Sequence, residues 1–343
     1  MNKGKIVTTI GAILLTTGVI GGAYSGVIAF PKVMSNMQNA ESSLNKDEVL
    51  YKGQVNLTKL NINAKNSNIT IKKYDGQNVI VERGGDKTIS TIIANESGNE
   101  LNITEEAIIN PHFGKNIDDM VKNFINHMYL SHHSEITVYI PNNVDINVKT
   151  YHGRLNVYDS NINNLNFNTS SGRLELNENC HINNLNIKSN DLIQLQVSEL
   201  YRLNNLNVEC YSFGTYKQDI VSDKSSIPEN VNIVANGDCD EATLVDIDSN
   251  LPIAKNLEIT SNGNVGLNLP ILDYKFNFDV KASNDIYFDE QSKVKYMGTS
   301  VDKYLDSNYR FDKNELKGVI NENPKDNSSE YFVNIRSANV SFK

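Results

Sequence analysis

Short stretches in which apolar and polar residues alternate recur along most of this 343-residue chain. The string Asn-Asn-Leu-Asn starts at Asn163, Asn183 and Asn204, so successive copies lie 20 and 21 residues apart. Because side chains alternate between the two faces of a β-strand, this pattern predicts strands with one apolar and one polar face. Looser copies of the same strand start at Leu60, Val231, Leu257, Phe276 and Val333.

A second short alternating stretch follows most copies, after a corner that contains Gly or Asn. It occupies residues 153–157, 172–176 and 190–193 in the regular repeats, 67–71 near the start, and 263–265, 284–286 and 338–340 later. Gly153 and Gly172 fall at such corners, where the backbone needs a positive φ or a close approach that a side chain would block.

A unit of this size cannot bury its apolar face alone, so we expect the units to stack. Stacking in register brings equivalent residues into columns at the inter-strand spacing of about 4.8 Å, and asparagines in an outer column can bond along the stack. The expected columns are Leu165, Leu185 and Leu206 inside, and Asn166, Asn186 and Asn207 outside. The fold class predicted is therefore all-β, a parallel β-solenoid. No helical half-repeat follows the strands, which excludes leucine-rich repeats; an antiparallel sandwich stays as the alternative.

One segment departs from this pattern. Apolar residues at helical spacing fill residues 117–128, between predicted strands at 101–104 and 135–140. We expect one inserted helix at about residues 112–133, packed over an end or a side of the solenoid, where it would cover an exposed sheet edge.

The N-terminal part has the pattern of a membrane anchor. Lys3 and Lys5 precede an uncharged stretch at residues 6–30, which is long enough to cross the bilayer with some tilt. The basic N-terminal side predicts residues 1–5 in the cytoplasm, a single transmembrane helix at 6–30, a juxtamembrane linker at 31–50 and an extracellular domain at 51–343. A cleaved signal peptide with its site near residues 23–25 is the alternative.

Small residues line one face of this predicted transmembrane helix. Gly18, Gly22 and Gly26 are spaced four residues apart, as in helices that self-associate in membranes. The face is a candidate for a homodimer contact, although glycine is also simply frequent in such helices.

The charge of the chain restricts its partners. With 32 basic and 41 acidic residues the net charge is −9, which argues against nucleic-acid binding and against direct attraction to anionic polymers or lipid headgroups. Divalent cations or cationic peptides are compatible with this charge.

One column of charged residues is a candidate contact surface. Arg154 and Arg173 occupy matching positions one repeat apart, and Asp191 occupies the third. If the repeats stack in register, Asp191 offsets the repulsion between the arginines, and an exposed pair of this kind contributes only about 0–1 kcal/mol. The column is then either a set of ordinary surface charges or a strip that faces a ligand.

The remaining reactive residues predict no cofactor and no metal site. Cys180, Cys210 and Cys239 form no Cys-x-x-Cys pair, so isolated buried thiols are expected, with a Cys210–Cys239 bridge as the alternative. The histidines lack the i, i+4 spacing of a metal pair and suit a solvated helix end. The four that cluster in the sequence are His112, His127, His132 and His133.

The acidic residues do not form an obvious catalytic pair. A glycoside hydrolase needs two carboxyl groups at a fixed separation, whereas here the acids are dispersed and no nucleophile elbow, phosphate loop or dinucleotide motif occurs. The alternation of Asp and Ile at residues 246–248 also suits an exposed strand or a weak calcium site. The acids to inspect for a shared cleft with a Lys or Arg are Asp238, Asp240, Glu241, Asp246 and Asp248.

The strand at 135–141, the stretch at 146–148 and the two Gly-Arg-Leu corners at 153–155 and 172–174 resemble a bacterial adhesin-like family of β-strand repeats. That family is domain of unknown function 4097, and the resemblance covers roughly residues 57–342, more weakly after residue 231. It implies a right-handed solenoid-like β fold outside the cell, a single N-terminal span and no established reaction. The helical insertion, and Asn190-Asp191 where a Gly is expected, depart from the family pattern.

Together these features predict a non-enzymatic protein of the cell envelope. We expect a membrane-tethered extracellular β-solenoid that acts as an adhesin-like binding or scaffold module, with envelope stress signalling as a linked role. Its partner would be an unidentified envelope component or protein. The alternative is a carbohydrate-active enzyme, a polysaccharide lyase or hydrolase on the same scaffold.

Overall fold

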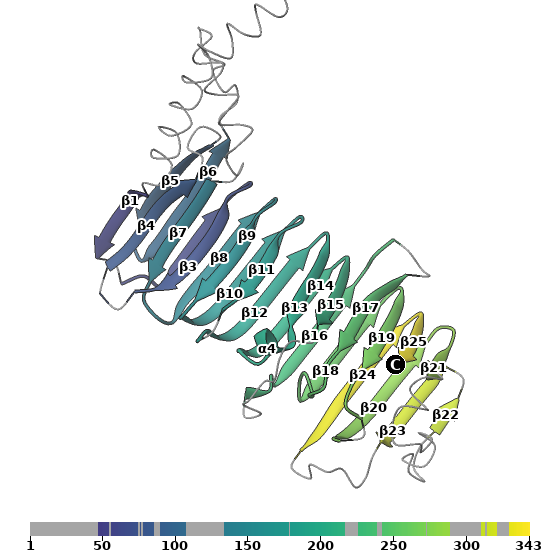
Figure 1. The fold of residues 1–343 in the computed structure, drawn as a ribbon. Helices are drawn as coiled ribbons and strands as arrows, with labels where there is room; N and C mark the ends of the chain where they lie inside the picture. The colour runs from purple at the N-terminus through teal and green to yellow at the C-terminus, as the bar shows by residue number, and fades with distance from the viewer. Residues whose placement is uncertain are drawn as a thin grey trace, which may run out of the picture. The chain divides into compact units, whose positions relative to one another are not determined.

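The computed structural model describes residues 47–54, 56–74, 76, 78–85, 90–107, 134–177, 179–216, 226–238, 242–271, 273–288, 310–312, 314–320 and 329–343. The chain divides into two compact units, and nearly all of these residues belong to the unit formed by Val49–Arg83, Ile92–Glu106 and Glu135–Lys343. This unit contains the strands from which the fold is built (Figure 1).

The described strands form three sheets, in each of which spatial neighbours are hydrogen-bonded. In spatial order, the long sheet contains β22 (Arg310–Asp312), β23 (Glu315–Ile320), β20 (Lys275–Ala282), β24 (Glu330–Ser337), β18 (Asn256–Ser261), β16 (Asn230–Ala235), β14 (Leu203–Cys210), β12 (His181–Ser189), β10 (Asn161–Thr169), β8 (Val144–Thr150), β2 (Lys59–Asn63), β6 (Glu100–Ala107) and β5 (Ser90–Ser97). The N-terminal short sheet contains β1 (Glu48–Gln54), β4 (Asn78–Gly85), β7 (Ser134–Ile140), β3 (Asn68–Lys73), β9 (Arg154–Tyr158) and β11 (Arg173–Leu176). The C-terminal short sheet contains β13 (Leu192–Gln196), β15 (Ser212–Tyr216), β17 (Thr243–Asp248), β19 (Asn264–Asn268), β25 (Asn339–Phe342) and β21 (Ile286–Phe288).

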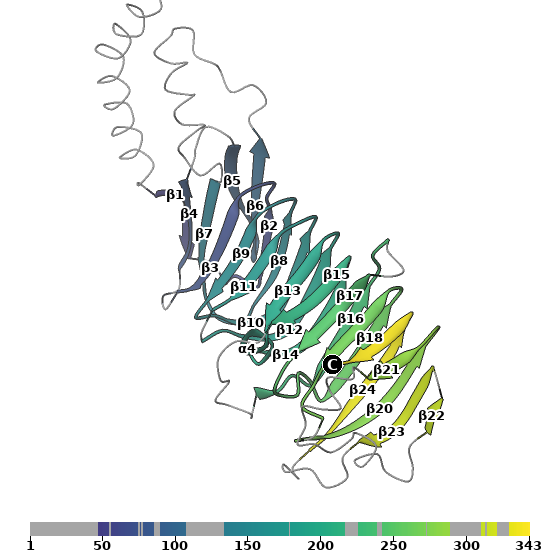
Figure 2. The ribbon, with the colours of Figure 1, turned by 45° about the vertical axis from the view of Figure 1, so that its right-hand side comes forward.

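The regular repeats stack in register, as their spacing predicts. In each coil, a strand of the long sheet leads into a strand of a short sheet, and equivalent strands of successive coils pair in parallel (Figure 2). Leu165 lies opposite Leu185, and Leu185 lies opposite Leu206. The parallel β-solenoid is therefore confirmed for these coils, and the antiparallel sandwich is excluded.

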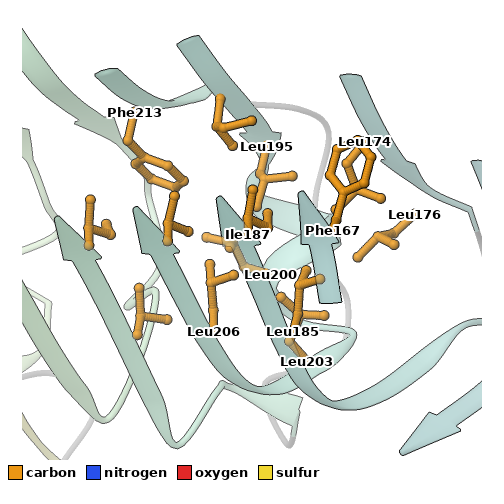
Figure 3. Close-up of a cluster of buried hydrophobic side chains, with 14 of the residues drawn as sticks. Phe167, Leu174, Leu176, Leu185, Ile187, Leu195, Leu200, Leu203, Leu206 and Phe213 are labelled. Atoms are coloured by element: carbon orange, nitrogen blue, oxygen red, sulfur yellow. The ribbon is translucent and has the colours of Figure 1, made fainter. Parts of the chain in front are cut away.

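The apolar side chains of the two sides meet in one core. Leu165, Leu185 and Leu206 are completely buried. In Figure 3 the side chains of Phe167, Ile187 and Leu206 from the long sheet lie together with Leu195 and Phe213 from the short sheet. Because burying one such side chain contributes about 1.5–3 kcal/mol, repetition of the apolar positions stabilises the stack.

The two predicted corner glycines lie where backbone and side chains approach too closely for a larger residue. Gly153 has a φ of 153°, and a Cβ atom there would lie 2.4 Å from the backbone oxygen of Ser67. At Gly172 a Cβ would lie 2.4 Å from Thr169 Oγ1 and 2.8 Å from the backbone oxygen of Gly153. A side chain at either position would force neighbouring coils apart.

The order of the coils at both ends differs from the order of the sequence. The Val333 copy is the last one along the chain, but its strand β24 lies between β18 and β20, and β25 lies between β19 and β21. Likewise β2 and β3, which come early in the chain, lie between later strands: β2 between β8 and β6, and β3 between β9 and β7. The apolar pattern determines which face of a strand is buried but not which neighbour it takes, since every strand offers the same alternation.

Two further elements depart from a purely parallel stack. β23 pairs antiparallel with β20 and with β22, so the long sheet ends in antiparallel strands. A short helix, α4 (Val197–Leu200), follows β13 and was not predicted. Its four residues lack the length that would give a helical period in the sequence.

The described residues do not include the segments of several predictions. The span at 6–30 with Gly18, Gly22 and Gly26, the insertion helix at about 112–133, and most of the linker at 31–50 lie outside them; β1 begins within that linker, at Glu48. Among the residues that the structure does describe, no helix is long and apolar enough to cross a bilayer.

Candidate binding surface

Asparagine side chains form a continuous hydrogen-bonded column on the outer face of the long sheet. Each Nδ2 group donates to the Oδ1 atom of the asparagine on the next strand, always in the direction from β14 towards β6. The donor–acceptor distances are 2.9 Å for Asn207–Asn186, 2.9 Å for Asn186–Asn166, 2.7 Å for Asn166–Asn147, 2.8 Å for Asn147–Asn61 and 3.0 Å for Asn61–Asn102. The amide bonding expected along the outer column is therefore present, and it extends over six strands.

Two more asparagine columns run beside the first, nearer the start of the strands. One consists of Asn204, Asn183 and Asn163, and the other of Asn256, Asn230, Asn205, Asn184 and Asn164. Both columns end on one carboxylate, since Asp145 Oδ1 accepts from Asn163 at 3.1 Å and from Asn164 at 2.8 Å. A carboxylate suits this end because it accepts several hydrogen bonds and has no N–H group that would itself need an acceptor.

The strict alternation of buried and outward residues is interrupted where two consecutive asparagines occur. Ile182 and Leu185 are both buried, although they are three positions apart, and Asn183 and Asn184 between them are only partly buried. The pairing of β10 with β8 shifts register at the equivalent place, between Ile162 and Leu165. The repeated Asn-Asn-Leu-Asn string is thus the local sequence at which the alternation shifts by one residue and the outer side becomes rich in amides.

The outer face of the long sheet is hollowed into two adjoining depressions. One, of about 510 Å³, is lined by residues of β10, β12, β14 and β16, together with Asn236; the other, of about 420 Å³, is lined by residues of β6, β2, β8 and β10. Asn166 and Asn168 line both depressions. We call the outward side of β6, β2, β8, β10, β12, β14 and β16 the asparagine face.

A row of exposed polar side chains follows the main column on this face. Lys188 is paired with Glu209 at 2.9 Å. Asn63 and Asn168 are exposed, and within the described part of the chain their side chains make no hydrogen bond. These two amides are therefore available to a ligand without breaking any contact of the fold.

Arg154 and Arg173, two of the predicted contact residues, face the same side of the N-terminal short sheet. They lie opposite each other on β9 and β11, and both pair with Glu175, at 3.6 Å and 3.2 Å. The third, Asp191, lies in the corner before β13, where its Oδ1 atom accepts from the backbone of Leu192 at 2.8 Å. The acid beside the arginines is thus Glu175, because β11 and β13 belong to different sheets.

A buried glutamate lies where these two short sheets are interrupted. Glu199 of α4 is 4% exposed, and its carboxylate accepts from the backbone nitrogens of Leu176 at 2.8 Å and Gln196 at 2.6 Å. Arg202 donates to the backbone oxygen of Leu176. Burial raises the pKa of the Glu199 carboxyl above its ordinary value, against the opposing effect of these hydrogen bonds and of the Arg202 charge.

The cysteines and histidines offer no convergent reactive group in the described residues. Cys180 and Cys210 are free and buried, as isolated thiols were expected to be, and burial raises the pKa of both, that of Cys210 to about 12. Cys239 and the four predicted histidines lie outside the described residues. No group of three or more His, Cys, Asp or Glu that could hold a metal occurs in the described part of the chain.

The acids proposed for a catalytic pair are engaged in separate contacts. Asp246 pairs with Lys343 at 2.5 Å on the exposed side of β17, and Asp248 accepts from Asn268 at 2.7 Å. Asp238 is exposed, and Asp240 and Glu241 lie outside the described residues. The three acids that the structure describes, Asp238, Asp246 and Asp248, do not line the depressions of the asparagine face.

The sequence predicted the main asparagine column but missed Asp145, Asn63 and Asn168. Strict alternation assigns only every second residue to the outer face, so it did not identify the paired columns. Asp145 was detectable in retrospect, because Val144-Asp145-Ile146-Asn147 has the repeat pattern with Asp in place of an Asn.

The fold and this surface define a parallel β-solenoid repeat protein with an amide-rich outer face. The family model described as Toastrack DUF4097 matches residues 57–212, which confirms the predicted resemblance for this part of the chain. The matched segment ends at the first residue of β15, whereas the coils continue to Phe342.

Two solved structures are similar to this chain. One is described as a "putative cell adhesion protein" from Clostridium sporogenes, with 11% identity and a TM-score of 0.18, and the other as a "putative adhesin" from Bacteroides fragilis, with 8% identity and a TM-score of 0.35. In both cases the match covers 87% of this chain and 98% of the other. No curated protein sequence matches the chain.

Proposed function

We propose that this chain is a non-enzymatic binding and scaffold module of the bacterial cell envelope. The observation that carries the proposal is the repetition of equivalent polar side chains on successive coils, above all the six-asparagine column beside two depressions. Such a surface offers the same contacts many times to an extended partner. Adhesion and envelope-stress sensing are the two uses that the proposal includes.

Binding is favoured over catalysis by the arrangement of the polar groups. Catalysis requires a few groups that converge on one reacting atom, whereas the asparagines, the Lys188–Glu209 pair and the Arg154–Glu175–Arg173 cluster are spread over several coils. Asp246 and Asp248, on alternate positions of β17, contact different partners, Lys343 and Asn268. The arrangement gives the carbohydrate-active alternative no specific support.

The tether belongs to the same proposal. The uncharged stretch at 6–30 would hold the module at the membrane, with residues 1–5 in the cytoplasm and the coils outside. A contact between two such helices through Gly18, Gly22 and Gly26 would join two copies of the chain into a homodimer.

Cell fractionation and envelope sedimentation test this proposal together. The full-length chain should appear in the membrane fraction, and protease added to intact cells should digest its C-terminal tag; a variant lacking residues 6–30 should leave the membrane fraction. The detergent-solubilised chain should co-sediment with isolated cell envelopes. A cytoplasmic, protease-protected chain that sediments with no envelope would disprove it.

The contribution of the predicted charged column can be measured in the same assay. If Arg154 and Arg173 face the partner, Arg154→Glu combined with Arg173→Glu should reduce co-sedimentation, while Arg202→Gln, which removes a charge elsewhere, should not. If the double variant sediments as the native chain does, these arginines do not contact the partner and are ordinary surface charges.

A further inference from the structure

The asparagines of the main column keep half of their hydrogen-bonding capacity. A side-chain amide has two N–H donors and an oxygen with two lone pairs. Inside the column, Asn147, Asn166 and Asn186 each use one donor towards one neighbour and one lone pair towards the other. Each of these three asparagines therefore has one donor and one acceptor left over, repeated at a strand spacing of about 4.8 Å, whereas Asn61 also donates to Glu100 at 3.2 Å.

Free amides lie where the two depressions meet and in the one nearer β6. Asn168 lines both depressions and Asn63 lines one, both are exposed, and neither side chain is hydrogen-bonded within the described part of the chain. Together with the column they give a surface of closely spaced donors and acceptors in equal numbers. A ligand that matches it must itself carry groups that both donate and accept, as hydroxyl groups do.

The charged residues that line the two depressions are few and largely cancel. Lys188 and Glu209 neutralise each other at 2.9 Å, which leaves Lys149 as the cation without an ion pair among the described lining residues. An anionic polymer would gain one charge contact here and would meet a chain of net charge −9. A neutral ligand avoids this repulsion.

The depressions also indicate the size of the ligand. They extend over seven neighbouring strands of the long sheet, from β6 to β16, which spans about 29 Å. The only aromatic residue lining them, Phe167, has its side chain in the core, at 1% exposure. Binding here would consist of many hydrogen bonds along an extended molecule, each of them weak.

We propose that the asparagine face binds a neutral, polyhydroxylated polymer, a glycan chain, laid across the coils from β6 to β16. The inference rests on the proposed function, because it names the class of molecule that the binding module recognises.

Calorimetric titration of the full-length, detergent-solubilised chain with defined oligosaccharides tests the inference. The neutral probes are the dimers and hexamers of β-1,4-linked glucose and N-acetylglucosamine, and the anionic probe is the hexamer of galacturonic acid. At least one neutral hexamer should bind about tenfold or more tightly than its dimer, since two or more additional hydrogen bonds suffice for this factor. Raising the salt concentration from about 50 to about 300 mM should leave this affinity unchanged, because no charges pair.

Variants locate the binding on this face. Asn63→Ala combined with Asn168→Ala should lower the affinity for the hexamer about fivefold or more, with an unchanged unfolding midpoint, since neither side chain supports the fold. The matched control is Asn190→Ala, which removes an exposed asparagine outside both depressions and should have no effect.

Three results would overturn the inference. They are an absence of binding by every neutral hexamer, stronger and salt-sensitive binding of the galacturonate hexamer, and full binding by the Asn63/Asn168 double variant. If the chain still sediments with cell envelopes in these cases, the binding module stands and only its glycan assignment fails. A chain that binds neither hexamers nor envelopes would remove both.

Discussion

Glu199 shows how one residue maintains the fold where the sheet pairing is interrupted. β11 is the last strand of its sheet, so the backbone nitrogen of Leu176 lacks a strand partner there and donates to the Glu199 carboxylate instead. The same carboxylate accepts from the first residue before α4. A buried backbone donor without an acceptor would cost about 1–3 kcal/mol, which gives this acid a structural role.

The raised pKa of Glu199 makes part of the stability depend on pH. Because its pKa in the folded chain lies above the ordinary value of 4.5, the folded state binds the proton more tightly than the unfolded state. The resulting stabilisation is complete below 4.5 and is lost as the pH rises through the folded-state pKa. We expect the free energy of unfolding of the native chain, minus that of Glu199→Gln, to decrease over this range and then to level off.

Urea unfolding of the two chains at a series of pH values measures this difference. Glu199→Gln should also be less stable at every pH, since an amide offers one acceptor oxygen in place of two. A difference curve that increases with pH would contradict the assigned direction of the pKa shift.

The strands of the asparagine face contribute to the stack through their buried alternation and through their outer amides. The asparagine column fixes the register, because a slip by one residue would bring asparagines opposite apolar side chains. In the centre of the column, Asn186 donates to Asn166 and accepts from Asn207, each at 2.9 Å.

Replacement of Asn186 tests the contribution of the column to stability. Asn186→Ala removes both hydrogen bonds and should lower the free energy of unfolding by about 1–2 kcal/mol. Asn168→Ala on the neighbouring strand β10, which breaks no hydrogen bond of the described structure, should change it by less than about 0.5 kcal/mol. Chemical denaturation provides the comparison, and equal effects of the two substitutions would show that the column stabilises nothing.

The sequence predicted those features of the long sheet that depend on local pattern. The spacing of Leu165, Leu185 and Leu206 by 20 and 21 residues was sufficient to predict the inner column and the in-register stack. It could not predict the neighbours of β24, since Leu257 fits opposite Val333 as well as opposite Phe276. The depressions were also beyond the pattern, because each is lined by residues from four strands that are far apart in the sequence.

At the scale of the whole described unit, the two coils that lie between others, β2 with β3 and β24 with β25, alter how the stack is expected to unfold. In an ordinary repeat protein the last repeat has one neighbour and opens most readily. Here the C-terminal coil has neighbours on both sides: Ile335 of β24 lies opposite Ile259 of β18 and opposite Val280 of β20. Aromatic contacts also connect this coil to β20, since the rings of Phe278 and Phe342 pack edge to face at 5.5 Å.

The end of the chain should therefore be as stable as its middle. Ile335 in β24 and Ile233 in β16 are both completely buried between two parallel neighbours, so they form a matched pair. Ile335→Ala and Ile233→Ala should each cost about 2–5 kcal/mol and should differ by less than about 1 kcal/mol. Native-state hydrogen exchange should likewise show the amides of β24 protected as strongly as those of β16. If β24 exchanges fast while β16 stays protected, the terminal coil opens separately, and its place between β18 and β20 does not hold that end of the stack.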